Sequence, residues 1–97
     1  MSVPFAESYV RAPATVVSRA VEDTTVLLDT ATGRYFSLDQ VGTRAWAHLT
    51  TAASIEAAFE ALLEEFDVEP ERLREELASL IARLASSGLL EVRRVAG

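Results

Sequence analysis

The feature that most constrains the fold is a change of hydrophobic period within TVLLDTATGRYFSLDQVGTRAW, which runs from Thr25 to Trp46. Up to Leu38 the pattern is typical of strands: an apolar run, a turn ending at Gly33, and then alternating residues. Beyond this point apolar residues recur at helical spacing. A helix that directly follows a small sheet has to bury its apolar side against that sheet, which predicts an α+β domain.

Three strands are predicted, over residues 14–21, 24–29 and 34–38. The first is rich in β-branched residues, and the second has a continuous Val-Leu-Leu run that indicates burial on both faces. Alternation along the third strand places Phe36 in the core. It places Tyr35 on the opposite face, either as a packing residue or as part of a binding surface. Short turns between these strands favour a three-stranded antiparallel meander.

Three helices follow the strands. Ser37 or Asp39 is positioned to cap the first, Ser54 to cap the second, and Pro70 suits the first turn of the third. Gly88 is positioned to end the third helix. The apolar stripes expected to face the core are Val41, Ala45, Trp46 and Leu49; Ile55, Ala58, Phe59, Leu62, Leu63 and Phe66; and Leu73, Leu77, Leu80, Ile81 and Leu84.

Together these elements predict a single winged-helix-like domain over residues 1–97. It has a three-stranded antiparallel sheet, then three helices, and a possible short C-terminal strand within residues 89–95. Residues 1–13 contain Pro4 and Pro13 and are expected to form a flexible N-terminal arm or an edge extension.

Composition narrows the possible functions. The chain has 97 residues, no cysteine, and a net charge of −6. The missing cysteine excludes disulfides and thiolate metal sites. The negative charge disfavours nucleic-acid binding, because phosphate neutralisation needs a basic surface. With no signal peptide and no membrane-spanning run, we expect a soluble cytoplasmic protein with no membrane partner.

The sequence offers no clear catalytic or metal-binding group, so neither a cofactor nor a metal is expected. His48 is the only histidine, and no nucleophile motif surrounds any serine. Its place near a helix C-terminus favours a structural role. Phosphate-binding glycine motifs are absent. Trp46 is expected in the core.

The predicted third strand has a possible function of its own. It is the last strand of the meander and carries one charge, Arg34, so its outer edge is little protected. Such an edge can bind an extended peptide by strand addition. Alternatively, the C-terminal strand or the N-terminal arm covers this edge; the pattern alone does not decide between the two.

From about Thr25 to Leu90, the chain resembles the PqqD-like family, the peptide-recognition elements of pathways that modify ribosomally made peptides. The matching segments are VLLDTATGRYFSLDQVGTRAW, SIEAAFEALLEEFDVEPERLREEL and LIARLASSGLLE, in this order. The resemblance implies a non-catalytic protein that binds the leader segment of a precursor peptide. The size of the chain resembles that of the stand-alone recognition protein of lasso-peptide pathways. Such a protein delivers its precursor to a leader peptidase and then a cyclase.

The resemblance also implies a site. The leader adds a strand to residues 34–38 and lies against the third helix, and its Tyr and Pro enter apolar pockets. Arg74 and Glu76 are expected to flank the groove at its rim and to pair with charges of the leader, and Leu84 is a further candidate. The residues expected to bind peptide are Arg34, Tyr35, Phe36, Ser37, Leu38, Leu73, Arg74, Leu77 and Leu80.

Two other functions remain open at this point. A winged-helix DNA-binding regulator would share the fold, since fold does not determine function. A small structural or regulatory subunit of an enzyme complex is the third possibility.

Overall fold

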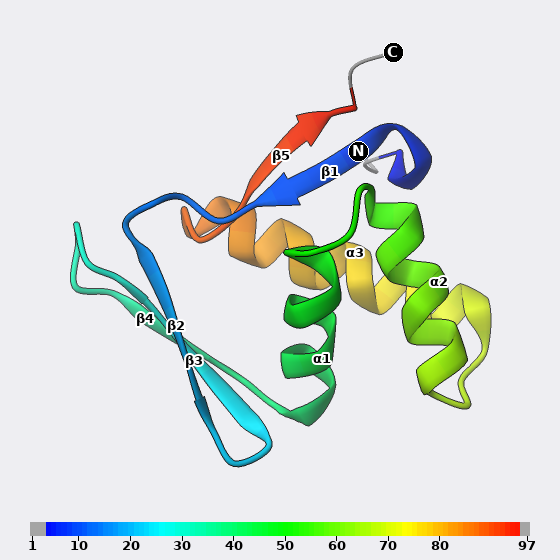
Figure 1. Ribbon diagram of the computed structural model, residues 1–97, viewed down its shortest axis with the longest axis horizontal. Helices are drawn as coiled ribbons and strands as arrows, with labels where there is room; N and C mark the ends of the chain where they lie inside the picture. The colour runs from blue at the N-terminus through cyan, green and yellow to red at the C-terminus, as the bar shows by residue number, and fades with distance from the viewer. Residues whose placement is uncertain (1–3, 96–97) are drawn as a thin grey trace.

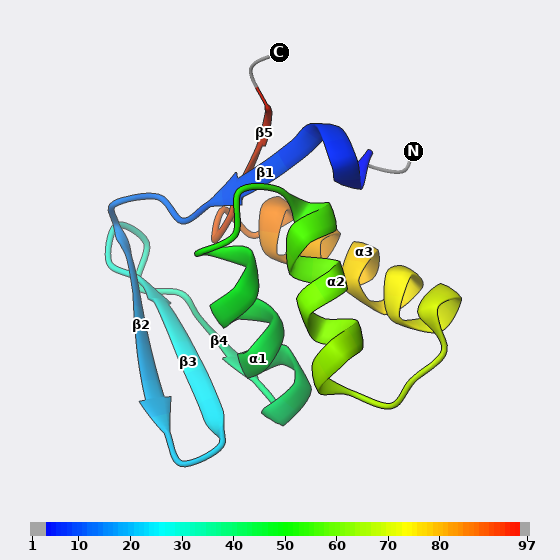
Figure 2. The ribbon, with the colours of Figure 1, turned by 45° about the vertical axis from the view of Figure 1, so that its right-hand side comes forward.

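The computed structural model describes residues 4–95, and its elements confirm the predicted α+β fold (Figure 1). Strands β2 (Val16–Val21), β3 (Thr24–Asp29) and β4 (Tyr35–Leu38) form an antiparallel sheet in the order β2-β3-β4. The sheet lies on one side of the three helices, with β2 outermost (Figure 2). Both β2 and β4 are therefore edge strands.

Strand β3 is buried on one face only, so the expectation of burial on both faces is wrong. Thr25, Leu27 and Asp29 are buried, whereas Leu28 is 39% exposed. Although the sequence of β3 is continuously apolar, its side chains alternate between a buried face and an outer face. The outer face of this small sheet has no layer packed on it in the described structure. Gly33, at φ +76°, closes the turn into β4.

The three helices begin where the capping residues indicate. Helix α1 (Gln40–Leu49) is capped by Asp39, whose carboxylate accepts from Gly42 N–H at 2.8 Å. Helix α2 (Ile55–Glu65) is capped by the Ser54 hydroxyl, and α3 (Pro70–Ser86) has its proline in the first turn. At the end of α3, Leu89 N–H donates to Leu84 C=O at 2.9 Å around Gly88, at φ +76°. This is the glycine-terminated helix end that the sequence predicted.

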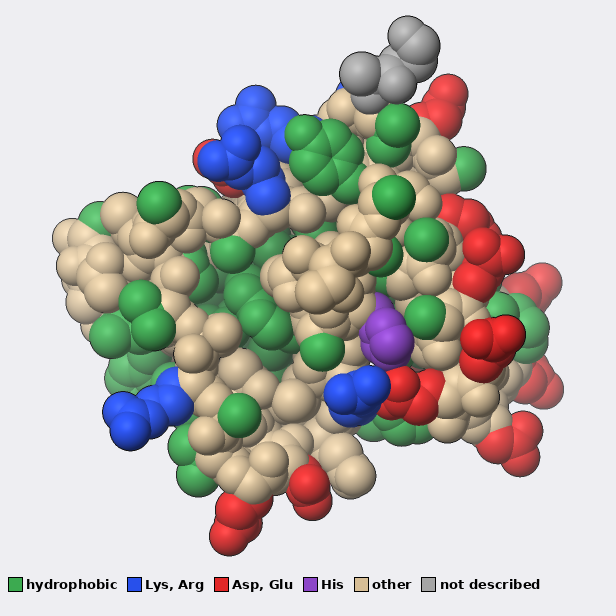
Figure 3. Space-filling model, in the orientation of Figure 1, with side chains coloured by type: hydrophobic (Ala, Val, Ile, Leu, Met, Phe, Trp, Pro, Cys, Tyr) green, Lys and Arg blue, Asp and Glu red, His purple; other side chains and the backbone are tan. Residues whose placement is uncertain are grey.

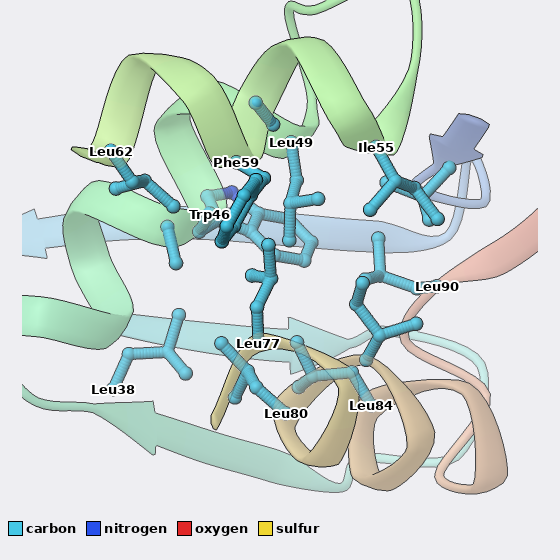
Figure 4. Close-up of a cluster of buried hydrophobic side chains, with 14 of the residues drawn as sticks. Leu38, Trp46, Leu49, Ile55, Phe59, Leu62, Leu77, Leu80, Leu84 and Leu90 are labelled. Carbon is cyan, nitrogen blue, oxygen red and sulfur yellow. The ribbon is translucent and has the colours of Figure 1, made fainter. Parts of the chain in front are cut away.

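The core is a cluster in which the three helical stripes meet β4 and the segment after α3 (Figure 4). Trp46 is 8% exposed, which confirms its predicted place in the core. All five residues of the α3 stripe are buried. Val41 is the exception among the predicted core residues, because it is 44% exposed. Leu63 and Phe66 are partly buried against the cluster.

The N-terminal segment departs most from the sequence expectation. Phe5–Glu7 forms a 3-10 turn (η1), and β1 (Ser8–Arg11) pairs with the C-terminal strand β5 (Glu91–Arg94). This separate two-stranded sheet joins the two ends of the described chain. Phe5 and Val10 are both 5% exposed, so residues 5–11 are a packed element, not a flexible arm. Residues 1–3 of the expected arm lie outside the described residues.

Candidate functional site

A groove of about 590 Å³ lies between strand β4 and helix α3. The start of α1 closes one end. Its lining combines apolar side chains with polar and charged groups in nearly equal measure. The lining residues are Phe36, Ser37, Leu38, Asp39, Val41, Gly42, Ala45, Leu62, Leu73, Glu76, Leu77, Ser79, Leu80 and Arg83.

Six of the nine residues predicted to bind peptide line this groove. Phe36, Ser37 and Leu38 come from β4, and the three leucines of α3 form the opposite wall. Those leucines, Leu73, Leu77 and Leu80, are 5%, 2% and 8% exposed. They form this wall as part of the core, so a bound side chain would touch only their outer atoms.

The other three predicted residues lie elsewhere. Arg34 and Tyr35 line a neighbouring hollow of about 430 Å³ that shares Phe36 with the groove, and the Tyr35 residue is 73% exposed. Arg74 does not line either hollow. Its guanidinium lies 4.8 Å from the ring centroid of Phe5 and 4.3 Å from that of Phe59.

Arg74 is also 3.3 Å from the Glu56 carboxylate, so its partners belong to α2 and the N-terminal segment. It follows Leu73 by one residue, and one residue is about 100° of rotation around a helix. The expectation that Arg74 flanks the groove therefore does not match its position on α3.

The outer edge of β4 is unpaired in the described structure. Strands β1 and β5 pair with each other, so neither covers it. This observation resolves the alternative that the sequence left open.

The backbone N–H and C=O groups of each β4 residue point either toward β3 or away from it. Asp29 N–H donates to Arg34 C=O at 2.8 Å, which makes this pair hydrogen-bonded. Hydrogen-bonded and non-hydrogen-bonded pairs alternate along an antiparallel ladder. Leu27 faces Phe36 in a hydrogen-bonded pair, so the N–H and C=O groups of Tyr35 and Ser37 point away from β3. These are the groups that an added strand would bind.

Several lining residues were not among the predicted site residues. Arg83 is the most informative, since its guanidinium carbon lies 5.8 Å from the ring centroid of Phe36 across the groove. A signal existed: Glu76 and Arg83 are seven residues apart, which is two helical turns on one side of α3. Glu76 was predicted as a rim residue and does line the groove. Asp39 and Val41 line it because α1 starts directly after β4.

The strongest electrostatic cluster lies outside the groove and ties α1 to α2. Arg44 Nε and the Glu65 carboxylate are 2.6 Å apart, and His48 Nε2 is 2.9 Å from the same carboxylate. The hydrogen bond from Arg44, and next that with His48, lowers the pKa of Glu65 to about 2. This is the structural role expected for His48, although its partner is a carboxylate in addition to the helix end.

Metal ligands do not gather anywhere in residues 4–95: no three acidic or histidine side chains are placed to hold an ion. Within the same residues, every helix is too short or too polar to span a bilayer.

Residues 24–90, from β3 to the end of the core, match the family model described as coenzyme PQQ synthesis protein D (PqqD). The chain belongs to the PqqD family. The resemblance that the sequence suggested is therefore confirmed. No curated protein sequence matches this PqqD-family chain.

Two solved structures resemble this PqqD-family chain. TbiB1, in complex with the TbiA(beta) leader peptide, is 34% identical, with a TM-score of 0.76 over 84% of this chain and 94% of that one. The lasso peptide synthetase B1, complexed with its leader peptide, is 20% identical, with a TM-score of 0.73 over 84% and 96%. At this lower identity the second match supports the fold alone.

Proposed function

We propose that this PqqD-family chain binds the leader segment of a ribosomally made precursor peptide in lasso-peptide maturation. The leader adds a strand to the free edge of β4 and packs its side chains into the groove against α3. The chain performs no chemistry itself. It delivers the precursor to a separate leader peptidase and then to the cyclase.

The observation that carries this proposal is the position of the free edge beside the groove. The outward backbone groups of Tyr35 and Ser37 supply sequence-independent hydrogen bonds. On the same strand, Phe36 and Leu38 supply apolar side chains to the groove that would receive alternate side chains. Backbone pairing gives affinity in such an arrangement, and the groove gives selectivity.

The relatives support the same interpretation. TbiB1, which is 34% identical over most of both chains, is described in complex with a leader peptide. In this chain, the groove and the free strand edge lie within the residues that match the family model.

Leader binding is tested by fluorescence anisotropy with labelled leader peptides. The probes are the TbiA(beta) leader and the leaders of precursor peptides encoded beside the gene for this chain. We expect saturable binding in the micromolar range or tighter. No binding by any of these leaders would contradict the proposal.

A proline substitution tests strand addition without disturbing the core. The Ser37 N–H points away from β3, so Ser37→Pro removes an outward donor and leaves the β3–β4 ladder paired. We expect about tenfold weaker leader binding or more, since a lost hydrogen bond that leaves its partner unpaired costs about 1–3 kcal/mol.

The matched control is Ser18→Pro on the opposite edge of the same sheet. Thr30 N–H donates to Thr15 C=O at 2.8 Å, so alternation directs the Ser18 N–H away from β3 as well. Ser18→Pro should bind leader normally. Equal weakening by the two substitutions would show that the leader does not use β4.

Delivery needs a test of its own. Incubated alone with a full-length precursor, the chain should leave the mass of that precursor unchanged. Adding the leader peptidase should produce cleavage, and the Ser37→Pro variant should slow that cleavage. Equal cleavage rates with the native chain and the variant would argue against delivery through β4.

A further inference from the structure

Charges of opposite sign lie at the two ends of the groove. At one end, Arg83 lies over Phe36. At the other, Asp39 follows Leu38, and Glu76 precedes Arg83 by two turns of α3, a rise of roughly 10 Å. Figure 4 places Leu38 toward Leu77 and away from Leu84, consistent with β4 and α3 running in opposite directions.

Arg83 has no ion-pair partner in the described structure. Five other arginines lie within 4.0 Å of a carboxylate, and no carboxylate of residues 4–95 comes that close to Arg83. The paired arginines are Arg11, Arg44, Arg72, Arg74 and Arg93.

Arg19, Arg34 and Arg94 also have no ion-pair partner among the described residues, but of these four unpaired arginines Arg83 alone lines the groove. Arg83 stands in the last turn of α3, where a cation is favourable for the helix dipole. The interaction with the helix dipole leaves the N–H donors of the planar guanidinium free, and these donors can bind a carboxylate in a bidentate hydrogen bond.

The Asp39 and Glu76 carboxylates are engaged differently. Asp39 accepts the capping hydrogen bond of α1, and Glu76 lies 3.3 Å from Arg72 on the exposed side of α3. This end of the groove therefore presents two carboxylates and disfavours an acidic side chain. Arg34, which lines the hollow beyond Phe36, adds a second cation at the opposite end.

We propose that Arg83 is a specificity-determining residue that binds an Asp or Glu side chain of the peptide at the Phe36 end of the groove. This rests on the proposed function. A strand can pair with a free edge in either direction. For a peptide that also carries a basic residue about three positions from the acidic one, Arg83, Asp39 and Glu76 together favour the direction that places the acidic residue beside Arg83.

The spacing sets the pattern that the peptide should carry. An extended strand rises about 3.3 Å per residue, so the two charged ends are roughly three residues apart along it. We expect one acidic residue at a fixed position, apolar side chains beside it, and a neutral or basic residue two to four positions further along.

The experiment works without a known leader sequence. A phage-displayed library of random 12-residue peptides is selected on four immobilised proteins: the native chain, Arg83→Gln, Arg83→Glu and the control Arg94→Gln. Arg94 lies on β5, lines neither hollow, and its substitution changes net charge as Arg83→Gln does.

We expect peptides with Asp or Glu at one fixed position from the native chain and from Arg94→Gln. This preference should disappear with Arg83→Gln and change to Lys or Arg with Arg83→Glu. A selected peptide should bind Arg83→Gln about fivefold more weakly at low salt, as expected for a partly exposed ion pair. The difference should shrink in 1 M salt.

A peptide variant gives the same answer without any change to the protein. Replacing the selected acidic residue by its amide should weaken binding to the native chain and leave binding to Arg83→Gln unchanged. Apolar peptides selected without an acidic position, or equal affinity for the native chain and Arg83→Gln, would overturn the role of Arg83 alone. Failure of all four proteins to enrich any peptide would overturn peptide capture at β4 as well.

Discussion

Asp39 performs two tasks at the joint between sheet and helix. Its carboxylate caps α1 through Gly42 N–H at 2.8 Å, and its side chain also lines the groove. A β carbon at Gly42 would lie 3.2 Å from Asp39 Oδ1 and 3.3 Å from Leu38. The turn from β4 into α1 is therefore tightly packed at the end of the groove.

We expect Asp39→Ala to lower the free energy of unfolding by about 1 kcal/mol, because it removes the capping acceptor. Urea denaturation followed by circular dichroism measures this change. Asp39→Asn keeps a capping oxygen and should retain most of the stability. If the asparagine variant loses as much as the alanine variant, the capping bond is not the cause.

Single residues also mark where sequence reasoning fails. Phe36 and Leu38 were predictable as inward-facing residues, because alternation along a strand fixes their side. The position of Arg74 was not predictable, because its partners Phe5, Glu56 and Phe59 lie far from it in sequence. A helical stripe identifies the buried side of α3, but the neighbours of a flanking residue depend on how the elements pack.

At the scale of elements, the pairing of β1 with β5 joins the two ends of the described chain, with Ser8 opposite Arg94. Each strand has only four residues, too few to show a clear period, and the pairing is highly nonlocal. The sequence therefore indicated a loose arm where the structure has a strand. The adjacent Phe5 packs edge-on against Phe59, with ring centroids 6.0 Å apart.

Phe5→Ala should lower the free energy of unfolding by about 3 kcal/mol, the usual cost of deleting a buried aromatic ring. Leader affinity should be unchanged at a temperature where the variant is folded, because Phe5 lines neither hollow. Thermal denaturation and leader anisotropy measure the two effects. Phe5→Leu is the control and should lose less stability; a loss of affinity in folded Phe5→Ala would link this segment to the groove.

The ion pairs of Glu65 with Arg44 and His48, which join α1 to α2, make the stability of the fold depend on pH. The pKa of Glu65 is lowered from its ordinary 4.5 to about 2, chiefly by the hydrogen bond from Arg44. A carboxyl group with a lower pKa in the folded state stabilises the fold above its unfolded pKa, and this contribution is lost as the pH falls. The window for Glu65 is therefore from about pH 4.5 down to about pH 2.

We expect the native chain to lose more thermal stability across this window than Glu65→Gln does. Melting temperatures measured at several pH values give the comparison. Glu64→Gln is the matched control, because Glu64 is exposed and belongs to none of the ion pairs found among the described residues. Parallel profiles of melting temperature against pH for the native chain and Glu65→Gln would refute the contribution of these ion pairs to stability.

At the scale of the whole molecule, charge separates the PqqD-family fold from the DNA-binding domains whose shape it shares. The net charge is −6, and acidic side chains gather over the helical side of the face in Figure 3. A surface of this sign repels phosphate, so we expect no shift of a random-sequence duplex in a gel at low salt. A salt-sensitive shift at micromolar protein would favour the regulator interpretation.

The groove itself is a property of the whole molecule and was only partly predictable. Its β4 wall follows from alternation and its α3 wall from a helical stripe. Val41 lines the groove from the first turn of α1, whereas the helical stripe predicted it in the core. The family resemblance predicted that β4 and α3 form the two walls of one groove. Only the packed structure showed that Arg83 lines it.

The free edge of β4 has a practical consequence for handling the protein. An edge that accepts a peptide strand also accepts the same strand of another copy, and like charge is one of the forces that keep copies apart. That repulsion vanishes near the isoelectric point of about 4.7. Sedimentation velocity should therefore detect self-association of concentrated protein near this pH, and saturating leader should suppress it. Association that leader does not reverse would place the contact on another surface.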